Sequence, residues 1–275
     1  MASPMRAIRL CADDYGIAPG VNAAIADLIQ HGRINATSVM VVAPSLDAAA
    51  VASLVGVAAG RAEIGLHFTL TSPFSPLTQG FKPLKNGAFL PLGRTLASAI
   101  GRLLDSRALA AEADAQLREF IDKFGRPPDF VDGHQHVHLF PQIRDAVLAA
   151  MKIRAPNAWA RQCAYARNAW LGGPKGLLIH LVSSRFRERA TRFGVAMNPA
   201  FAGAYGFDEA ADFSALFPRF LAGLPDRGLI MCHPGFVDDA LRRLDRLTDL
   251  REREYAYLAS ERFLADLTAA GVRLL

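Results

Sequence analysis

Cysteine is scarce in this sequence, which holds only Cys11, Cys163 and Cys232 among its 275 residues. An odd number of cysteines without a short spacing excludes a disulfide framework and a zinc ribbon. The chain also lacks a run of about 20 apolar residues that could span a bilayer, and its first residues do not form a signal peptide. These absences predict a protein of the reducing cytoplasm.

Motifs of several common protein classes are missing too. There is no glycine-rich dinucleotide fingerprint, no phosphate-cradling loop and no Gly-x-Ser-x-Gly nucleophile elbow. Basic and aromatic residues are not interleaved as in nucleic-acid binding, so we expect no nucleic-acid partner. The net charge of +5 comes mostly from arginines dispersed among acidic residues. This dispersal indicates solvated helix faces, with peripheral contact to an anionic membrane or glycolipid as the alternative.

What is present is the composition of a globular protein, with 51% hydrophobic and 21% charged residues. No linker divides the chain, so residues 1–275 are expected to form a single domain. Apolar runs and helical periodicity alternate along it, which predicts an α/β fold with a parallel sheet. The expected strands are 7–12, 37–43, 63–70, 130–132, 228–232 and 272–275. The expected helices are 19–31, 46–59, 96–104, 108–124, 141–151, 175–193 and 258–270, with loops at 71–93 and 198–206.

Polar side chains stand where four of the predicted strands end: Asp13 and Asp14, His67, His134, and His233. An open sheet would leave some of these groups remote from the others. A barrel of parallel strands gathers the carboxyl ends of its strands at one face, where active sites lie. We therefore predict a single-domain, distorted (β/α) TIM-like barrel.

The first candidate group is Asp13-Asp14, followed by Tyr15-Gly16. Two close carboxylates repel each other unless a cation or a proton relieves them. The alternative is a helix cap, because aspartate stabilises that position. His67 lies in an apolar strand, where a lone histidine is more often a hydrogen-bonded core residue than a ligand. The company of the other candidates favours metal ligation for both groups.

The segment Asp132-Gly133-His134-Gln135-His136-Val137-His138 is the strongest local signal. If it is extended, its three histidines share one face, as ligands of one ion would. Neutral imidazoles suit zinc and other transition metals, and Asp132 could orient a ligand imidazole from behind. His233 follows another apolar strand and could exchange a proton near pH 7, or could be an ordinary loop histidine.

At these residues the sequence resembles the YdjC-like family, which includes chito-oligosaccharide and hopanoid-associated sugar deacetylases. The resemblance implies a distorted (β/α) barrel, one divalent metal ion, and hydrolysis of the acetamido group of a hexosamine. Carried over by position, it implies Asp14, His67 and His134 as metal ligands, Asp13 as base and His233 as acid. The matching segments, in the family's order, are Ala12–Gly16 with Gly20–Asn22, Ile64–His67, Asp132–His138 with Phe140–Ile143, and Met231–Phe236.

The sequence departs from the family where Tyr15 replaces a frequent Phe and Gly133 a frequent Ser. Residues 155–206 match only loosely, and we expect substrate choice to lie there. His136 and His138 are assigned to contacts behind the ligands or with substrate. The metal stays open between Mg²⁺ and Zn²⁺, because two imidazoles favour a transition metal while the family is often described with magnesium.

The sequence does not name the acetylated sugar. Chitobiose, a hexosamine-bearing lipid and a cell-wall fragment all stay open as substrates. A metal-dependent phosphoesterase or amidohydrolase on a similar barrel is the rival enzyme. The rival from another class is a non-catalytic sugar- or metal-binding protein. The oligomeric state is open as well, with a homodimer as one option.

Overall fold

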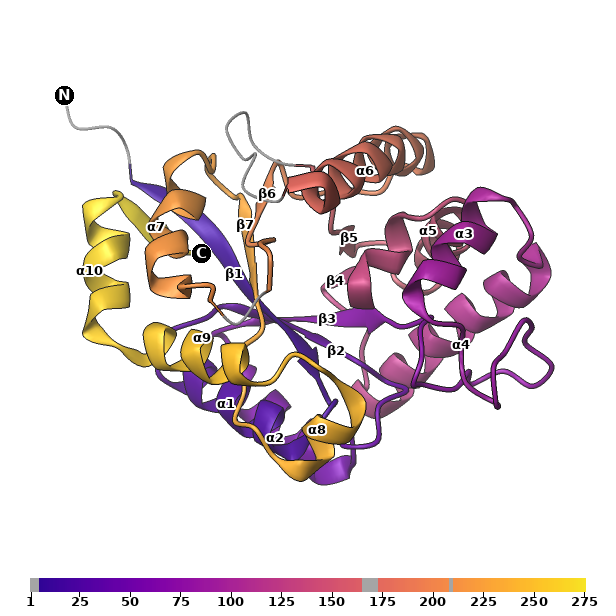
Figure 1. Cartoon of the computed structure of the whole chain (residues 1–275), viewed down its shortest axis with the longest axis horizontal. Coiled ribbons are helices and arrows are strands. Elements are labelled where there is room, and N and C mark those ends of the chain that lie inside the picture. Colours follow the sequence, from indigo (N-terminus) through magenta and orange to yellow (C-terminus); the bar gives the residue numbers. More distant parts are fainter. Residues whose placement is uncertain (1–4, 165–172, 208–209) are drawn as a thin grey trace.

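A curled sheet of parallel strands forms the centre of the protein (Figure 1). The computed structural model describes residues 5–164, 173–207 and 210–275. Within these residues the strands follow the order β5-β4-β3-β2-β1-β7-β6, and β8 pairs with β1 beside this path. The strands are β1 (Arg6–Tyr15), β2 (Ala36–Val39), β3 (Glu63–Phe68), β4 (Phe130–Gly133), β5 (Trp159–Ala160), β6 (Phe201–Ala202), β7 (Leu229–Cys232) and β8 (Val272–Leu274).

The two ends of the sheet approach each other but do not pair as full strands. The amide of Ala160, in β5, donates to the carbonyl of Ala196 over 2.8 Å. The amide of Phe201, in β6, donates to the carbonyl of Ala164 over 3.3 Å. Each contact joins one edge strand to the segment next to the other, which gives the distorted barrel class that the sequence predicts.

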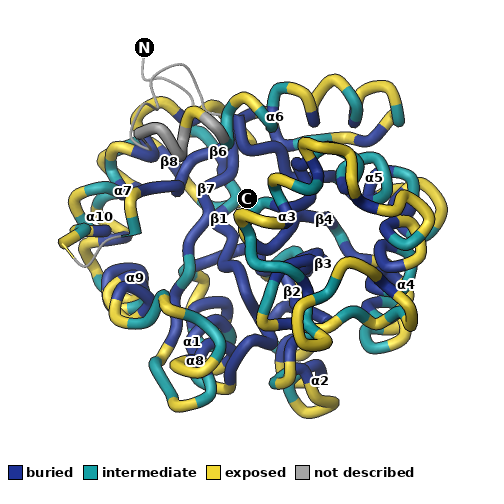
Figure 2. The backbone as a smooth tube through the Cα atoms, turned by 45° about the vertical axis from the view of Figure 1, so that its right-hand side comes forward, coloured by how far each residue is buried: buried dark blue, intermediate teal, exposed yellow. Residues whose placement is uncertain are grey.

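Helices surround the sheet and expose their outer faces (Figure 2). In α1, Pro19 opens the helix, and Val21, Ile25 and Leu28 recur at helical spacing and are buried against the sheet. The helices are α1 (Pro19–Gln30), α2 (Ala48–Ala58), α3 (Leu92–Ile100), α4 (Ser106–Phe124), α5 (Ile143–Arg154), α6 (Gly173–Phe193), α7 (Phe213–Ala222), α8 (Asp239–Leu244), α9 (Asp249–Ala259) and α10 (Glu261–Ala269), with a 3₁₀ helix, η1 (His134–Leu139). In the part of the chain that the structure describes, no helix is both long and apolar enough to cross a membrane.

Three expectations about the elements were wrong. The expected helix at 258–270 is divided at Ser260, whose backbone is extended and whose hydroxyl accepts a hydrogen bond from the amide of Phe263 at the start of α10. The expected loop 198–206 contains the two-residue strand β6. The helices α7, α8 and α9 were not anticipated; α9 buries the charged residues Arg251 and Glu254, so it lacks a clear apolar stripe.

The long loop predicted at 71–93 is confirmed up to the start of α3, and side chains of α4 hold it in place. Glu112 accepts hydrogen bonds from the amides of Leu77 and Thr78. Gln116 exchanges hydrogen bonds with the backbone of Thr69. The loop brings Phe74 edge-on to the ring of His134, with 5.8 Å between ring centroids.

Candidate metal and acid–base site

The site lies where β1, β3, β4 and β7 end, at the carboxyl end of the parallel sheet. Strand β1 carries both aspartates, and its pairing with β2 is irregular between Ala12 and Tyr15. Asp14 has a φ of +71°, in the left-handed region. This local change of direction allows Asp13 and Asp14 to reach one site from neighbouring positions, although their side chains have different partners.

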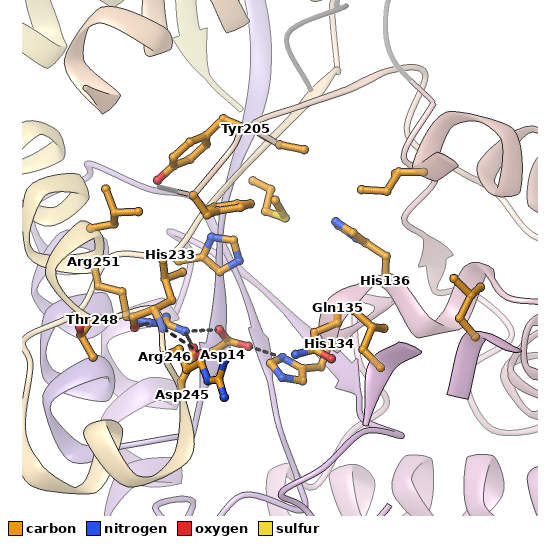
Figure 3. A pocket seen from close by; sticks show the side chains of 18 of the residues that line it. Asp14, His134, Gln135, His136, Tyr205, His233, Asp245, Arg246, Thr248 and Arg251 are labelled. Atoms are coloured by element: carbon orange, nitrogen blue, oxygen red, sulfur yellow. Dashed lines mark hydrogen bonds and ion pairs between the residues drawn. The ribbon is translucent and has the colours of Figure 1, made fainter. Parts of the chain in front are cut away.

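Asp14, His67 and His134 come together as the sequence predicts. His134 Nδ1 lies 2.9 Å from Asp14 Oδ1, and His67 Nε2 lies 3.2 Å from the same oxygen. One possible ligand atom from each of the three residues lies within 4.8 Å of the others, and all three residues are buried. Figure 3 shows His134 and Arg251 meeting Asp14 from opposite sides. A buried carboxylate with two imidazoles has the composition of a site for one metal ion.

His67 is oriented by a second carboxylate behind it. Its Nδ1 lies 2.6 Å from Asp132 Oδ1 and 2.9 Å from the hydroxyl of Ser38. Burial disfavours the protonated ring, but the negative charges of Asp132 and Asp13 outweigh burial and raise the pKa of His67 to about 10. The carboxylates around His67 therefore favour a positive charge at this point, whether a proton or a cation supplies it.

Asp13 is bound by a buried arginine that sequence reasoning missed. Arg161 follows β5 and is 0% exposed; its Nη1 and Nη2 lie 2.6 Å from the two carboxylate oxygens of Asp13. Its Nη2 also lies 2.5 Å from Asp132 Oδ2. Burial alone would raise the pKa of Asp13, but the guanidinium outweighs it and holds that pKa well below its usual range. Asp13 is therefore ionised.

Arg161 also lies at the centre of a second group of side chains that could hold a metal ion. Cys11, Asp13 and Asp132 bring possible ligand atoms within 4.8 Å of one another. Arg161 Nη2 contacts all three, including the sulfur of Cys11 at 3.0 Å. A guanidinium thus fills the position that a cation would take in this group. No local pattern marks Arg161, because the strand before it has only two residues.

His233 follows β7 and points into the same pocket as Asp14 (Figure 3). Its amide donates to Glu254 Oε2 over 2.5 Å, and its ring stands edge-on to Phe207. Its Nδ1 has no hydrogen-bond partner among the residues that the structure describes. Burial lowers the pKa of His233 to about 4, although Asp14 and Asp13 oppose this effect. The ring is therefore neutral at pH 7 in the resting site.

The expectation that an extended segment would place three histidines on one face was wrong. Gln135 and His136 have φ values of +53° and +60°, and the segment turns as η1. Of these three histidines, His134 is the one that meets Asp14. His136 Nδ1 lies 3.6 Å from the sulfur of Cys163, and His138 Nε2 lies 2.8 Å from the carbonyl of Arg161.

The close packing of His138 also explains why glycine, rather than the serine frequent in the family, fits at position 133. A Cβ atom on Gly133 would stand 2.8 Å from His138 Nδ1, closer than ordinary contacts allow. A serine there would require His138 to move. The glycine and the turned histidine segment therefore fit each other.

A cavity of about 430 Å³ opens above the aspartate and histidines. Asp14, His134, His136, His233 and Arg251 line it, and the segment at the start of α9 adds Asp245, Arg246, Thr248 and Asp249. The walls are largely apolar, with contributions from Leu92 and Leu96 of α3, Ile179 and Val182 of α6, and Phe140, Phe207, Leu247 and Leu250. A cleft that combines apolar walls with converging polar groups is typical of a small-molecule site.

Comparison with known proteins decides the family. The model of the YdjC-like proteins matches residues 7–269. This chain belongs to the YdjC-like family. Among its relatives is a chitooligosaccharide deacetylase of Proteus mirabilis, 30% identical over 87% of each chain. Another is a chitooligosaccharide deacetylase of Yersinia pestis, 30% identical over 96% of this chain and 94% of the relative.

A solved structure has the same fold. It is a protein of Enterococcus faecalis, provisionally assigned to cellobiose-phosphate cleavage, with a TM-score of 0.76 and 21% identity. The match covers 99% of this chain and 97% of that one. This likeness shows that the two chains share a fold over nearly their whole length.

Proposed function

We propose that this YdjC-like protein is a metal-dependent carbohydrate deacetylase that hydrolyses the acetamido group of an N-acetylated hexosamine. One observation carries the proposal: Asp14, His67 and His134 converge beside the cavity that His233 also lines. The names of the relatives support the reaction. The span of the family match supports treating residues 1–275 as one deacetylase domain.

Asp14, His67 and His134 would hold a single divalent ion. One carboxylate oxygen and two imidazole nitrogens suit zinc or another transition metal better than magnesium, which prefers oxygen ligands. When bound, such an ion polarises the amide carbonyl and lowers the pKa of a water molecule. Asp132 would keep His67 in position by its contact with Nδ1.

Asp13 would be the general base. Its two oxygens are bound by Arg161, so it stays ionised and able to accept a proton. The contact with Arg161 also lowers the basicity of Asp13. This loss is smaller because Arg161 contacts Asp132 as well, so its positive charge is shared between two carboxylates. Asp13 would take a proton from the attacking water, after which the tetrahedral centre carries the former carbonyl oxygen as an anion.

His233 would be the general acid. A neutral ring with a low pKa must first take up a proton, and the carboxylates of Asp13 and Asp14 favour its charged form. It would then protonate the departing amine, and the carbon–nitrogen bond breaks to give acetate and the free amino sugar. The proton that Asp13 took from water then returns to solvent, and His233 takes up another, so that both groups regain their starting states.

A chito-oligosaccharide is the first candidate substrate, because it is the substrate in the names of the relatives. A second candidate, an N-acetylhexosamine joined to an apolar group, is favoured by the apolar walls that α3 and α6 give the cavity. Leu92 and Leu96 face it from one helix, and Ile179 and Val182 from the other. These α6 residues lie in the segment where we expect substrate choice.

The test is acetate release by the metal-loaded protein. Diacetylchitobiose and N-acetylglucosaminides with short and long alkyl aglycones would be offered to the wild type, Asp13→Asn and His67→Ala. Exposed residues far from the site, in Asp122→Asn and His31→Ala, give matched controls. We expect release by the wild type and both controls, and a loss of about 10²–10⁴ in rate for Asp13→Asn.

The two active-site variants separate the proposal from its rivals. His67→Ala should lose both the metal and the activity. Release that survives Asp13→Asn would overturn the role of the base. Absence of acetate from every sugar, with hydrolysis of a phosphate ester instead, would overturn the deacetylase function in favour of the phosphoesterase.

A further inference from the structure

Helix α9 places two fully buried charged residues beside the site, on one face of a single helix. Arg251 and Glu254 are three residues apart, so they project in the same direction. Both are 0% exposed. Burying charges is costly unless each is paired, so such residues in a helix of 11 residues call for an explanation. Their partners provide one.

Arg251 contacts the carboxylate of Asp14 on the side away from the histidines. Its Nη2 lies 2.6 Å from Asp14 Oδ2 and 2.6 Å from Asp245 Oδ2, and its Nε donates to the carbonyl of Leu247 over 3.0 Å. Asp14 Oδ1 is the oxygen that approaches His67 and His134. Arg251 thus occupies one oxygen of Asp14 and leaves the other for the ligand cluster.

Glu254 contacts His233, on another side of the site from Asp14. Its Oε2 accepts from the amide of His233, and its Oε1 accepts from the hydroxyl of Tyr205, each over 2.5 Å. The helix is also tied to the segment after His233, because the amide of Gly235 donates to the carbonyl of Arg251 over 3.1 Å. The side chain of Glu254 therefore fixes the backbone from which His233 enters the cavity.

We propose that Arg251 and Glu254 are positioning residues. Arg251 restricts Asp14 to binding a metal ion through one oxygen, and Glu254 holds the backbone of His233 in place beside Asp14. This inference rests on the proposed function, because it takes Asp14 as a metal ligand and His233 as the acid. It assigns a different task to each of these two residues of α9. If α9 served only to pack against the barrel, substitutions of Arg251 and of Glu254 would have the same kind of effect.

The test measures Co²⁺ binding and turnover as two separate readouts. Co²⁺ affinity and its visible absorption spectrum would be recorded for the wild type, Arg251→Met, Glu254→Ala and Glu254→Gln. We expect Arg251→Met to weaken Co²⁺ binding by about 10–100-fold and to change the spectrum. Arg251→Lys keeps the charge but cannot hold both Asp14 and Asp245, so it should give a smaller loss.

Glu254→Ala should bind Co²⁺ within about threefold of the wild type, yet show kcat for acetate release lowered by roughly 10–100-fold, as expected for lost orientation of a reacting group. Glu254→Gln can still accept from the amide of His233 and should recover most of the turnover. The exposed Arg243, in Arg243→Met, is the matched control and should leave both readouts unchanged.

The outcomes separate this inference from the function on which it rests. Wild-type Co²⁺ affinity and spectrum in Arg251→Met would overturn the role of Arg251 while leaving the metal site intact. Equal losses of affinity and turnover in both α9 variants would indicate a purely structural helix. Failure of the wild type itself to bind Co²⁺ would overturn the proposed function, and the inference with it. If Arg251→Met does not fold, Arg251→Lys and Asp245→Asn provide the same comparison.

Discussion

The two halves of the sheet contribute to the site in different ways. The half from β1 to β4 supplies the groups with recognisable chemistry, the paired aspartates and the histidines at strand ends. The half that follows supplies mainly their charged partners: Arg161 after β5, and Arg251 and Glu254 on α9. His233 is the exception, because it belongs to the second half and is itself a candidate reacting group. The proposed ligands and the charged residues that contact them thus come from distant parts of the chain.

The difference has a physical cause. Four buried acidic or basic groups at one point repel or lose solvation unless opposite charges enclose them. The counter-charges come from other elements, Arg161 from directly after β5 and Arg251 from α9. The first half therefore determines which chemistry is available, and the second half determines its geometry and its charge state.

Removing a ligand from the first half should have the largest effect. Asp14→Ala deletes the oxygen nearest His67 and His134, so we expect no bound metal and no measurable acetate release. It also leaves Arg251 with Asp245 alone. Metal content by elemental analysis, beside the Asp122→Ala control, measures this. Full metal occupancy in Asp14→Ala would show that the ligands lie elsewhere.

Removing a partner from the second half should cost stability as well as rate. Arg161→Met leaves the buried Asp13 and Asp132 without their counter-charge. We expect about 3–5 kcal/mol of lost unfolding free energy. Denaturant melts of the metal-free protein check this, with the exposed Arg243→Met as control. A variant as stable as the wild type would mean that the two halves are electrostatically independent.

The stability of the protein should depend on pH through Glu254, a buried carboxyl group of the second half. Burial raises the pKa of Glu254 to about 7, despite its hydrogen bonds from Tyr205 and His233. The folded state then binds more protons than the unfolded state between about pH 4.5 and 7, so this group lowers stability as pH rises through that window. Glu254→Gln should remove this contribution. The difference in melting temperature between wild type and variant, followed from pH 4.5 to 8, would stay constant if the account is wrong.

The smallest effect is expected for Tyr15, whose hydroxyl joins two elements outside the candidate site. The hydroxyl of Tyr15 donates to the carbonyl of Ala50 over 2.7 Å, and joins β1 to α2. Tyr15→Phe, the residue frequent in the family, should lose about 1 kcal/mol of unfolding free energy. Acetate release should not change. A loss of activity would place Tyr15 in the site rather than beside it.

The same contrast explains what the sequence could predict. Strand ends with Asp13, Asp14, His67 and His134 were identified because residue type and local pattern coincide there. Their convergence then followed from a barrel of parallel strands. The helices from α1 to α6 were found because each has an apolar face or a proline start.

The partners could not be found in the same way. Arg161 follows a strand of two residues, too short for a periodicity to indicate it. Arg251 and Glu254 lie in a stretch with the composition of a solvated helix. Their partners are distant in the sequence: Arg251 contacts Asp14, 237 residues away, and Glu254 contacts Tyr205 and the amide of His233. The turn at Gln135 and His136 depends on left-handed backbone angles, which are uncommon for residues other than glycine. Each of these features is fixed by tertiary contacts rather than by local sequence.

The central claim is that one metal ion, held by Asp14, His67 and His134, supports deacetylation. Its most direct test is a titration of the metal-free protein with Zn²⁺ or Co²⁺ while acetate release from diacetylchitobiose and the alkyl N-acetylglucosaminides is measured. The account predicts activity that rises linearly and stops at one ion per chain, and that is absent in His67→Ala. Acetate release without metal, or a rise that continues to two ions per chain, would contradict it.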